Sequence, residues 1–134
     1  MTEFPVPEPT ELTGFFWEGG LDGRLLFLTC QGCSYRIHPP APFCPICRER
    51  DVTPQPVSGV GAVYSFTVNY QDWGSVTGPY ALAIIQLDEQ DDLRLLSTLV
   101  GCPVSDIHIG MRVAVDFDQR GDYAVPVFRP VATT

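Results

Sequence analysis

Two identical cysteine pairs carry the most specific chemistry in this sequence. Cys30-x2-Cys33 and Cys44-x2-Cys47 are separated by a proline-rich segment of ten residues. Zn²⁺ prefers four soft ligands in a tetrahedron, and two such knuckles deliver them when their tight turns meet face to face. We therefore expect one closed structural Zn²⁺ site per chain, with Cys30, Cys33, Cys44 and Cys47 as its ligands.

Other chemistry stays open for the same residues. A rubredoxin-like iron site uses the same four ligands, and a single C-x2-C pair also occurs in thioredoxin-like redox proteins. Two pairs together favour a metal over a redox dithiol. His38 could replace one ligand, but beside four cysteines it is expected to be a surface or packing residue. The fifth cysteine, Cys102, is expected to be a small buried apolar residue.

A catalytic set is not recognisable in the sequence. His38 and His108 are the only histidines, and neither lies in a catalytic motif. His108 belongs to a turn-like link and is expected to be an exposed connector residue. The acidic run Asp88–Asp92 could hold a hard cation, but we expect a solvated hairpin tip. We therefore expect no catalytic residue and no enzyme activity from this chain alone.

Composition argues against polyanion and membrane partners. The formal net charge is −8 and the sequence pI is about 4.4, whereas nucleic-acid binding depends on basic residues that neutralise phosphates. The apolar share is 45%, with no apolar run of roughly 18 residues that could span a bilayer. The N-terminal residues lack the pattern of a signal peptide, so a reducing, cytoplasmic location is expected.

Aromatic residues are the best candidates for a partner surface. Phe15, Phe16 and Trp17 are adjacent and cannot all point to one side of a helix, so at least one is expected to face a partner. Trp73 falls in a predicted loop, and tryptophan is enriched at interface hot spots. We expect partner binding through these four side chains.

The N-terminal elements are predicted as an arm, a short helix and a strand. Three prolines within residues 1–11 favour an extended arm. A helix is expected from Thr10, as its cap, to about Leu21, and Gly19 and Gly20 are expected to end it. The segment from Gly23 to Thr29 predicts a strand that leads into the first cysteine pair.

The second half of the chain predicts a barrel. Pro54 and Pro56 indicate a joint, after which five runs rich in β-branched and aromatic residues alternate with turns. These runs are Gly59–Tyr70, Tyr80–Asp88, Leu93–Val100, Arg112–Phe117 and Ala124–Arg129. Five strands with a short, helix-like connection at Pro103–Gly110 suit an OB fold. The expected fold class is mainly β, divided into an arm and helix (1–22), a zinc ribbon (23–56) and a five-stranded OB-fold barrel (57–134).

The combination of motifs resembles a known family. The motifs are Phe16-Trp17-Glu18-Gly19, Gly23-Arg24-Leu25, the two cysteine pairs, Pro39-Pro40, Val57-Ser-Gly-x-Gly61 with Val63-Tyr-Ser-Phe66, Pro79-Tyr80-x-Leu82-Ala83, Leu87-Asp-Glu89 and Gly110-Met-x-Val113. Over about residues 12–130 the chain resembles the rubredoxin-like zinc-ribbon plus OB-fold proteins associated with acyl-CoA enzymes. The glycine usual after each knuckle in such proteins is replaced here by Ser34 and Arg48.

The resemblance implies an accessory role. Similar proteins accompany thiolase-superfamily enzymes, including C-acyltransferases and lipid-transfer-protein-like retro-aldolases that cut CoA-linked steroid side chains, and some are fused to MaoC-like hydratases. The implied function is therefore a non-catalytic subunit in a hetero-oligomer, which supports the fold and active site of its partner. The alternative is a module that itself binds or channels acyl-CoA, for which Arg48 and Arg50 form the one close arginine pair.

Overall fold

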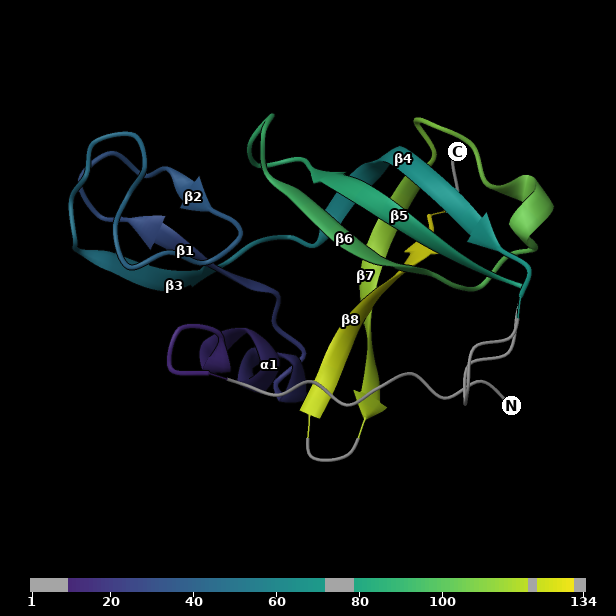
Figure 1. Cartoon of the computed structure of the whole chain (residues 1–134), viewed down its shortest axis with the longest axis horizontal. Coiled ribbons are helices and arrows are strands. Elements are labelled where there is room, and N and C mark those ends of the chain that lie inside the picture. Colours follow the sequence, from purple (N-terminus) through teal and green to yellow (C-terminus); the bar gives the residue numbers. More distant parts are fainter. Residues whose placement is uncertain (1–9, 72–78, 121–122, 132–134) are drawn as a thin grey trace.

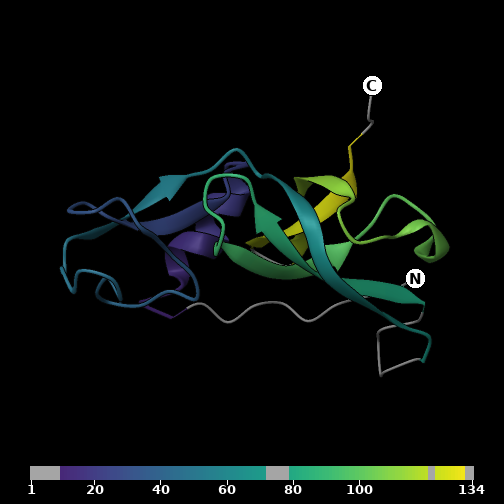
Figure 2. The ribbon, with the colours of Figure 1, turned by 90° about the horizontal axis from the view of Figure 1, so that it is seen from above.

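Five strands close into a barrel in the C-terminal half of the chain (Figure 1). The computed structural model describes residues 10–71, 79–120 and 123–131. The predicted arm at residues 1–9 and the predicted contact residue Trp73 lie outside this part. The fold is mainly β, with the barrel at one end, a three-stranded ribbon at the other, and a short helix beside them (Figures 1 and 2).

All five predicted barrel strands are present. They are β4 (Val60–Asn69), β5 (Tyr80–Leu87), β6 (Arg94–Leu99), β7 (Arg112–Arg120) and β8 (Tyr123–Pro130). Their order around the barrel is β4-β5-β6-β8-β7, with β6 and β8 parallel and the other neighbours antiparallel. This is the OB-fold arrangement. A 3₁₀ turn at Val104–Asp106 occupies the expected short connection between β6 and β7.

Alternating burial along the strands builds the barrel core. In β5 every second side chain is buried, including Ile85 and Leu87, as the two-residue period of a strand requires. Val63, Val113 and Phe128 meet them from β4, β7 and β8. The register of β4 shifts between Val63 and Ser65, which leaves Tyr64 as a bulge.

The ribbon contains two strands, β2 and β3, that the sequence did not predict. Its order is β2 (Arg36–Ile37), β1 (Leu26–Cys30), β3 (Val52–Pro56), and all pairs are antiparallel. Pro54 and Pro56, which indicate a joint, both lie in β3, directly before the connection to the first barrel strand. They are tolerated in a strand because β3 is an edge strand, where a residue that lacks an N–H group can face the unpaired side.

The helix α1 (Gly14–Leu21) starts later than predicted and continues through the two glycines. Thr10 precedes it in a turn, where its carbonyl accepts a hydrogen bond from the N–H of Gly14 at 2.8 Å. Gly19 and Gly20 do not end the helix. A Cβ at Gly19 would lie 2.8 Å from Leu26 Cδ1, and one at Gly20 would lie 2.2 Å from the Ala124 carbonyl oxygen. Both glycines are therefore needed for close packing of α1 on β1 and β8.

Two hydrophobic clusters meet on opposite faces of β1. Phe27 packs into the barrel core together with Phe16 of α1. Leu28 and Cys30 face a smaller cluster with Ile37 and Cys44 inside the ribbon. Strand β1 therefore connects the cysteine cluster mechanically to the barrel. In the described part of the chain, no helix has the length and apolar character needed to cross a membrane.

Candidate metal centre and its surroundings

The two cysteine knuckles have the same backbone design. In the first, the N–H of Cys30 donates to the Tyr35 carbonyl and the N–H of Ser34 donates to the Cys30 carbonyl, both at 2.9 Å. In the second, Cys44 bonds to the carbonyl of Glu49 at 2.8 Å, and Arg48 donates to that of Cys44 at 2.9 Å. Each tight turn thus directs its two thiols to the same side.

Each knuckle turns through a left-handed residue that is not glycine. Ser34 has φ of 66° and Arg48 has φ of 65°, and these are the two positions where the family resemblance leads one to expect glycine. A side chain in this region crowds the following carbonyl, which costs about 1–2 kcal/mol per residue. The turn geometry is therefore retained here against a local conformational preference.

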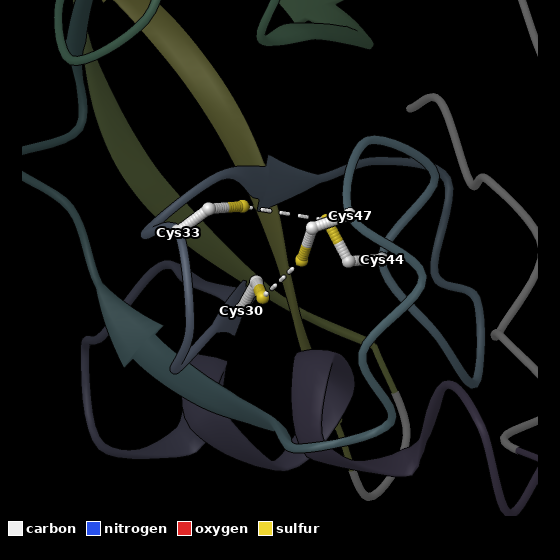
Figure 3. Close-up of side chains that lie close together, drawn as sticks. All are labelled: Cys30, Cys33, Cys44 and Cys47. Carbon is white, nitrogen blue, oxygen red and sulfur yellow. Dashed lines mark hydrogen bonds between the residues drawn. The ribbon is translucent and has the colours of Figure 1, made fainter.

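The four thiols converge on one point (Figure 3). Cys30 Sγ lies 3.4 Å from Cys47 Sγ, Cys33 Sγ lies 3.6 Å from Cys44 Sγ, and all four sulfur atoms lie within 4.8 Å of one another. None of these cysteines forms a disulfide. A tetrahedral ion with bonds to sulfur of about 2.3 Å would place its ligands about 3.8 Å apart. The arrangement fits a four-thiolate metal site, with no position left for a further ligand.

Crowding changes the acidity of these thiols in opposite directions. Burial raises the pKa of Cys44, but the N–H groups of Cys47 and Ile46 and two neighbouring thiols outweigh it, so that the pKa falls to about 7. At Cys47 the N–H of Glu49 lowers the pKa, but the Cys30 thiol, burial and the other thiols raise it to about 12. A cation bound among the thiols would favour their ionised forms.

The acidic hairpin attaches the ribbon to the barrel. Gln90 Nε2 donates to the Arg36 carbonyl at 2.8 Å, and Gln90 Oε1 accepts from the Arg36 N–H at 2.9 Å, so the side chain pairs with β2 as a strand would. Glu89 accepts the N–H of Ser58 at 2.6 Å. Asp88 at the end of β5 forms an ion pair with Arg112 of β7, which lowers the Asp88 pKa. The expectation of a merely solvated tip is corrected, because these side chains fix neighbouring elements.

His38 is a packing residue. Its ring stacks on Phe16, with centroids 6.0 Å apart, and meets Phe27 edge-on at 5.3 Å. Burial lowers its pKa, which favours the neutral ring. Its Nδ1 atom is buried and has no hydrogen-bond partner among the described residues. The histidine therefore belongs to the junction between ribbon, helix and barrel, and four cysteines rather than His38 form the metal cluster.

The aromatic helix is largely part of the core. Phe16 is only 7% exposed, which corrects the expectation that it offers surface to a partner: it closes the barrel core from the side. Phe15 and Trp17 are half-buried and pack on the same core. Trp17 also lines an apolar cleft between α1, β6 and β8. Partner binding through Phe15 and Trp17 stays a prediction.

Cys102, Asp106 and His108 line a second cleft of about 360 Å³, which the sequence analysis did not foresee. Burial, followed by the charge of Asp106, raises the pKa of the Cys102 thiol. A catalytic cysteine needs the opposite shift, because the thiolate is the nucleophile. His108 is exposed, as expected, and its Nδ1 lies 3.2 Å from the carbonyl oxygen of Asp106. This grouping does not have the electrostatics of a nucleophile and base.

Two family models match the chain over adjacent segments. Residues 17–53 match the model described as the ChsH2 rubredoxin-like zinc ribbon domain, and residues 54–118 match that of the ChsH2 C-terminal OB-fold domain. The first segment contains all four clustered cysteines, and the second contains most of the barrel.

Three curated proteins illustrate the likeness. A probable enoyl-CoA hydratase alpha subunit of Thermomonospora curvata is 34% identical over 94% of this chain, which spans only 40% of that protein. A DUF35 domain-containing scaffold protein of Methanocaldococcus jannaschii is 32% identical, with 69% of this chain and 67% of that protein covered. The benzoylsuccinyl-CoA thiolase subunit BbsA of Thauera aromatica is 32% identical, with 77% and 74% covered.

A solved structure shares nearly the whole fold. One chain of a structure described as the Ltp2-ChsH2(DUF35) aldolase matches with a TM-score of 0.85 and 33% sequence identity. The match covers 93% of this chain and 98% of that chain. The ribbon, helix and barrel therefore recur together in a chain of the same extent.

Proposed function

Because this chain belongs to the ChsH2 family of proteins with a rubredoxin-like zinc ribbon and an OB-fold domain, we propose that it is an accessory subunit of a thiolase-superfamily acyl-CoA enzyme. Its partner would be a thiolase-like or lipid-transfer-protein-like subunit that performs a C-acyl transfer or a retro-aldol cleavage. This chain would support the fold and the active site of that subunit in a hetero-oligomer.

One observation carries the proposal. The structural match to the Ltp2-ChsH2(DUF35) aldolase extends over 93% of this chain and 98% of the other, so the shared unit is the whole subunit rather than a common barrel. The names of two further relatives agree, since one is a thiolase subunit and another a scaffold protein. The hydratase alpha subunits are longer, and this chain matches only about 40% of their length. A MaoC-like hydratase is therefore the second type of partner that we propose.

We assign the four-cysteine cluster to one structural Zn²⁺ ion per chain, bound by Cys30, Cys33, Cys44 and Cys47. The chemistry of the donors supports this, because four thiols on two matched knuckles suit zinc and leave no open coordination position. When bound, the ion would neutralise the crowded thiolates and hold the two knuckles together. Its role would be to fold the ribbon, not to activate a substrate.

We also assign no independent catalysis to this chain, and place it in the cytoplasm with the acyl-CoA enzyme that it would serve. The scaffold relatives support a non-catalytic role. In the described part of the chain, Cys102 and His108 lack the acidity and positions that a nucleophile and its base require.

Co-expression tests the proposal. The full chain is produced alone and together with the thiolase-superfamily protein encoded nearest to its gene, and both preparations are purified under reducing conditions. We expect a stable complex, one zinc per chain, and turnover of acyl-CoA only when the partner is present. Replacement of Cys44 by Ser should remove the metal, whereas Cys102→Ser should retain it. Turnover by the chain alone, with contaminating enzymes excluded, would contradict the accessory role.

A further inference from the structure

Strands β6 and β8 pair through their main chains at a single position of the barrel. These parallel strands pair at Leu99 and Phe128, and the Ser97 hydroxyl donates to the Pro126 carbonyl at 2.9 Å. Figure 1 shows the two strands crossing at an angle, with β8 extending toward α1 and β6 extending away from it. Among the residues that the structure describes, no strand pairs with the β8 side of β6 before this junction.

The open edge can be assigned to particular main-chain groups. The N–H of Val100 donates to the Phe128 carbonyl at 2.9 Å, so it points toward β8. Main-chain groups of alternate residues point to the same side of a strand, so the N–H and C=O of Leu96 also face the gap. Pro126 of β8 has no N–H group that could donate a hydrogen bond to β6. The main-chain groups of Leu96 on this side of β6 therefore face a position where β8 does not pair with β6.

An apolar cleft of about 370 Å³ opens beside this edge. Trp17 and His38 line one side, Leu96 lines another, and Val125 and Pro126 complete it from β8. The Leu96 side chain is 65% exposed on the outer face of the barrel. The cleft is large enough for one or two apolar side chains of another molecule.

The absence of charged lining residues restricts which groups can bind in this cleft. The chain has a formal net charge of −8, yet no lining residue of this cleft is charged. A charged group that entered would lose its water without gaining a partner of opposite charge, which is unfavourable. The occupant must therefore be uncharged, and the strand edge requires that it present an extended backbone.

We propose that the catalytic partner adds an extended, uncharged segment of its chain to the edge of β6 at Leu96 and inserts an apolar side chain into the cleft beside Trp17. The inference rests on the proposed function, since it names the contact surface for that partner. Strand addition gives affinity through main-chain hydrogen bonds, and the pocket beside the strand selects the side chain. The proposed partner surface is therefore the cleft between α1, β6 and β8, not the exposed side of α1 itself.

Three variants distinguish the contribution of the Leu96 main chain to partner binding from that of its side chain. Leu96→Pro removes the edge N–H and places a ring in its way, while pairing with β5 does not use that group. Leu96→Ala removes only side-chain contact. Ile109→Ala is the matched control, because Ile109 is exposed to nearly the same degree, 68% against 65%, at another site. Zinc content and the thermal unfolding midpoint confirm that each variant is folded.

Affinity for the co-purified thiolase-superfamily partner is measured by titration calorimetry, and amide hydrogen exchange of β6 is followed in the free chain and the complex. Loss of the Leu96 N–H donor, together with steric exclusion by the proline ring, should weaken binding roughly tenfold or more in Leu96→Pro. A smaller loss is expected for Leu96→Ala and none for Ile109→Ala. The β6 amides should exchange more slowly in the complex.

The outcomes distinguish the inference from the proposed function. If the wild-type chain binds its partner but Leu96→Pro binds equally well, or β6 exchange is unchanged, the edge is not the contact and the inference alone is overturned. If the wild-type chain binds no such partner, the proposed function and the inference are both overturned. Saturable quenching of Trp17 fluorescence by octanoyl-CoA in a Trp73→Phe chain would assign the cleft to an acyl chain instead.

Discussion

The hydroxyl of Tyr35, in the first knuckle, donates a 2.7 Å hydrogen bond to Asp92, at the hairpin between β5 and β6. The bond to Asp92 and partial burial raise the Tyr35 pKa, so the donor keeps its proton through neutral pH. Together with the two bonds between Gln90 and Arg36, this contact fixes the metal centre relative to the barrel.

Loss of this contact should be measurable but small. Tyr35→Phe is expected to lower the free energy of unfolding by about 0.5–1 kcal/mol, because the hydrogen bond lies at the surface and competes with water. Urea unfolding of Tyr35→Phe, Asp92→Ala and the double variant gives the coupling energy directly. Strictly additive effects of the two substitutions would show that the hydrogen bond contributes nothing to stability.

Glycine at the left-handed positions should stabilise the ribbon. Ser34→Gly and Arg48→Gly relieve an unfavourable φ, but glycine also increases the entropy of the unfolded chain, so the net gain is expected to be about 0.5–1 kcal/mol each. Arg50→Gly is the control, since Arg50 lies in the same exposed loop without a positive φ, and it should not stabilise. The measurement is chemical unfolding of the metal-loaded protein. Destabilisation by both knuckle variants would refute this explanation.

Burial of His38 should make stability depend on pH. Its pKa is lowered in the folded state, so the unfolded chain binds the proton more readily, and stability is lost as the pH falls below the unfolded value of about 6.5. His38→Gln removes this contribution. We expect the difference in unfolding free energy between wild type and variant to decrease from pH 7.5 to pH 5.5, with metal content checked at each pH. A difference that is constant with pH would show that His38 does not titrate differently on folding.

Two glycines of α1 should respond to alanine in opposite ways. At Gly20 the new Cβ would lie 2.2 Å from the backbone oxygen of Ala124, and relief requires movement of the helix away from β8, at a cost of roughly 2–3 kcal/mol. Gly14 has nothing within 4 Å of the same position, and alanine there should stabilise by about 0.5–1 kcal/mol. Thermal unfolding compares the two. Equal effects would contradict the close packing of α1 on β8.

The sequence predicts those features that are encoded locally. The spacing of Cys30, Cys33, Cys44 and Cys47 indicates the metal cluster because each pair folds within its own tight turn. The five barrel strands follow from their apolar and β-branched runs, and the structure extends only β7 by several residues. The family resemblance is confirmed by both domain models.

Features that depend on distant contacts were not predictable in this way. Gly19 and Gly20 follow the pattern of a helix end, but packing against β1 and β8 overrides the local preference. Pro54 is tolerated only because β3 lies at an edge. Gln90 pairs with Arg36 across 54 residues of sequence, and nothing in the polar hairpin itself indicates this partner.

The contact between α1 and β8 also determines an order of events on the ribosome. The ribbon, from β1 to β3, can pair and close its knuckles once residue 56 has emerged. Helix α1 is synthesised earlier but packs on β8, which follows the other four barrel strands in the sequence. Until β8 has emerged, the core around Phe16 lacks Phe128. Helix α1 precedes the barrel in the sequence, but it cannot reach its final position before β8 has been synthesised.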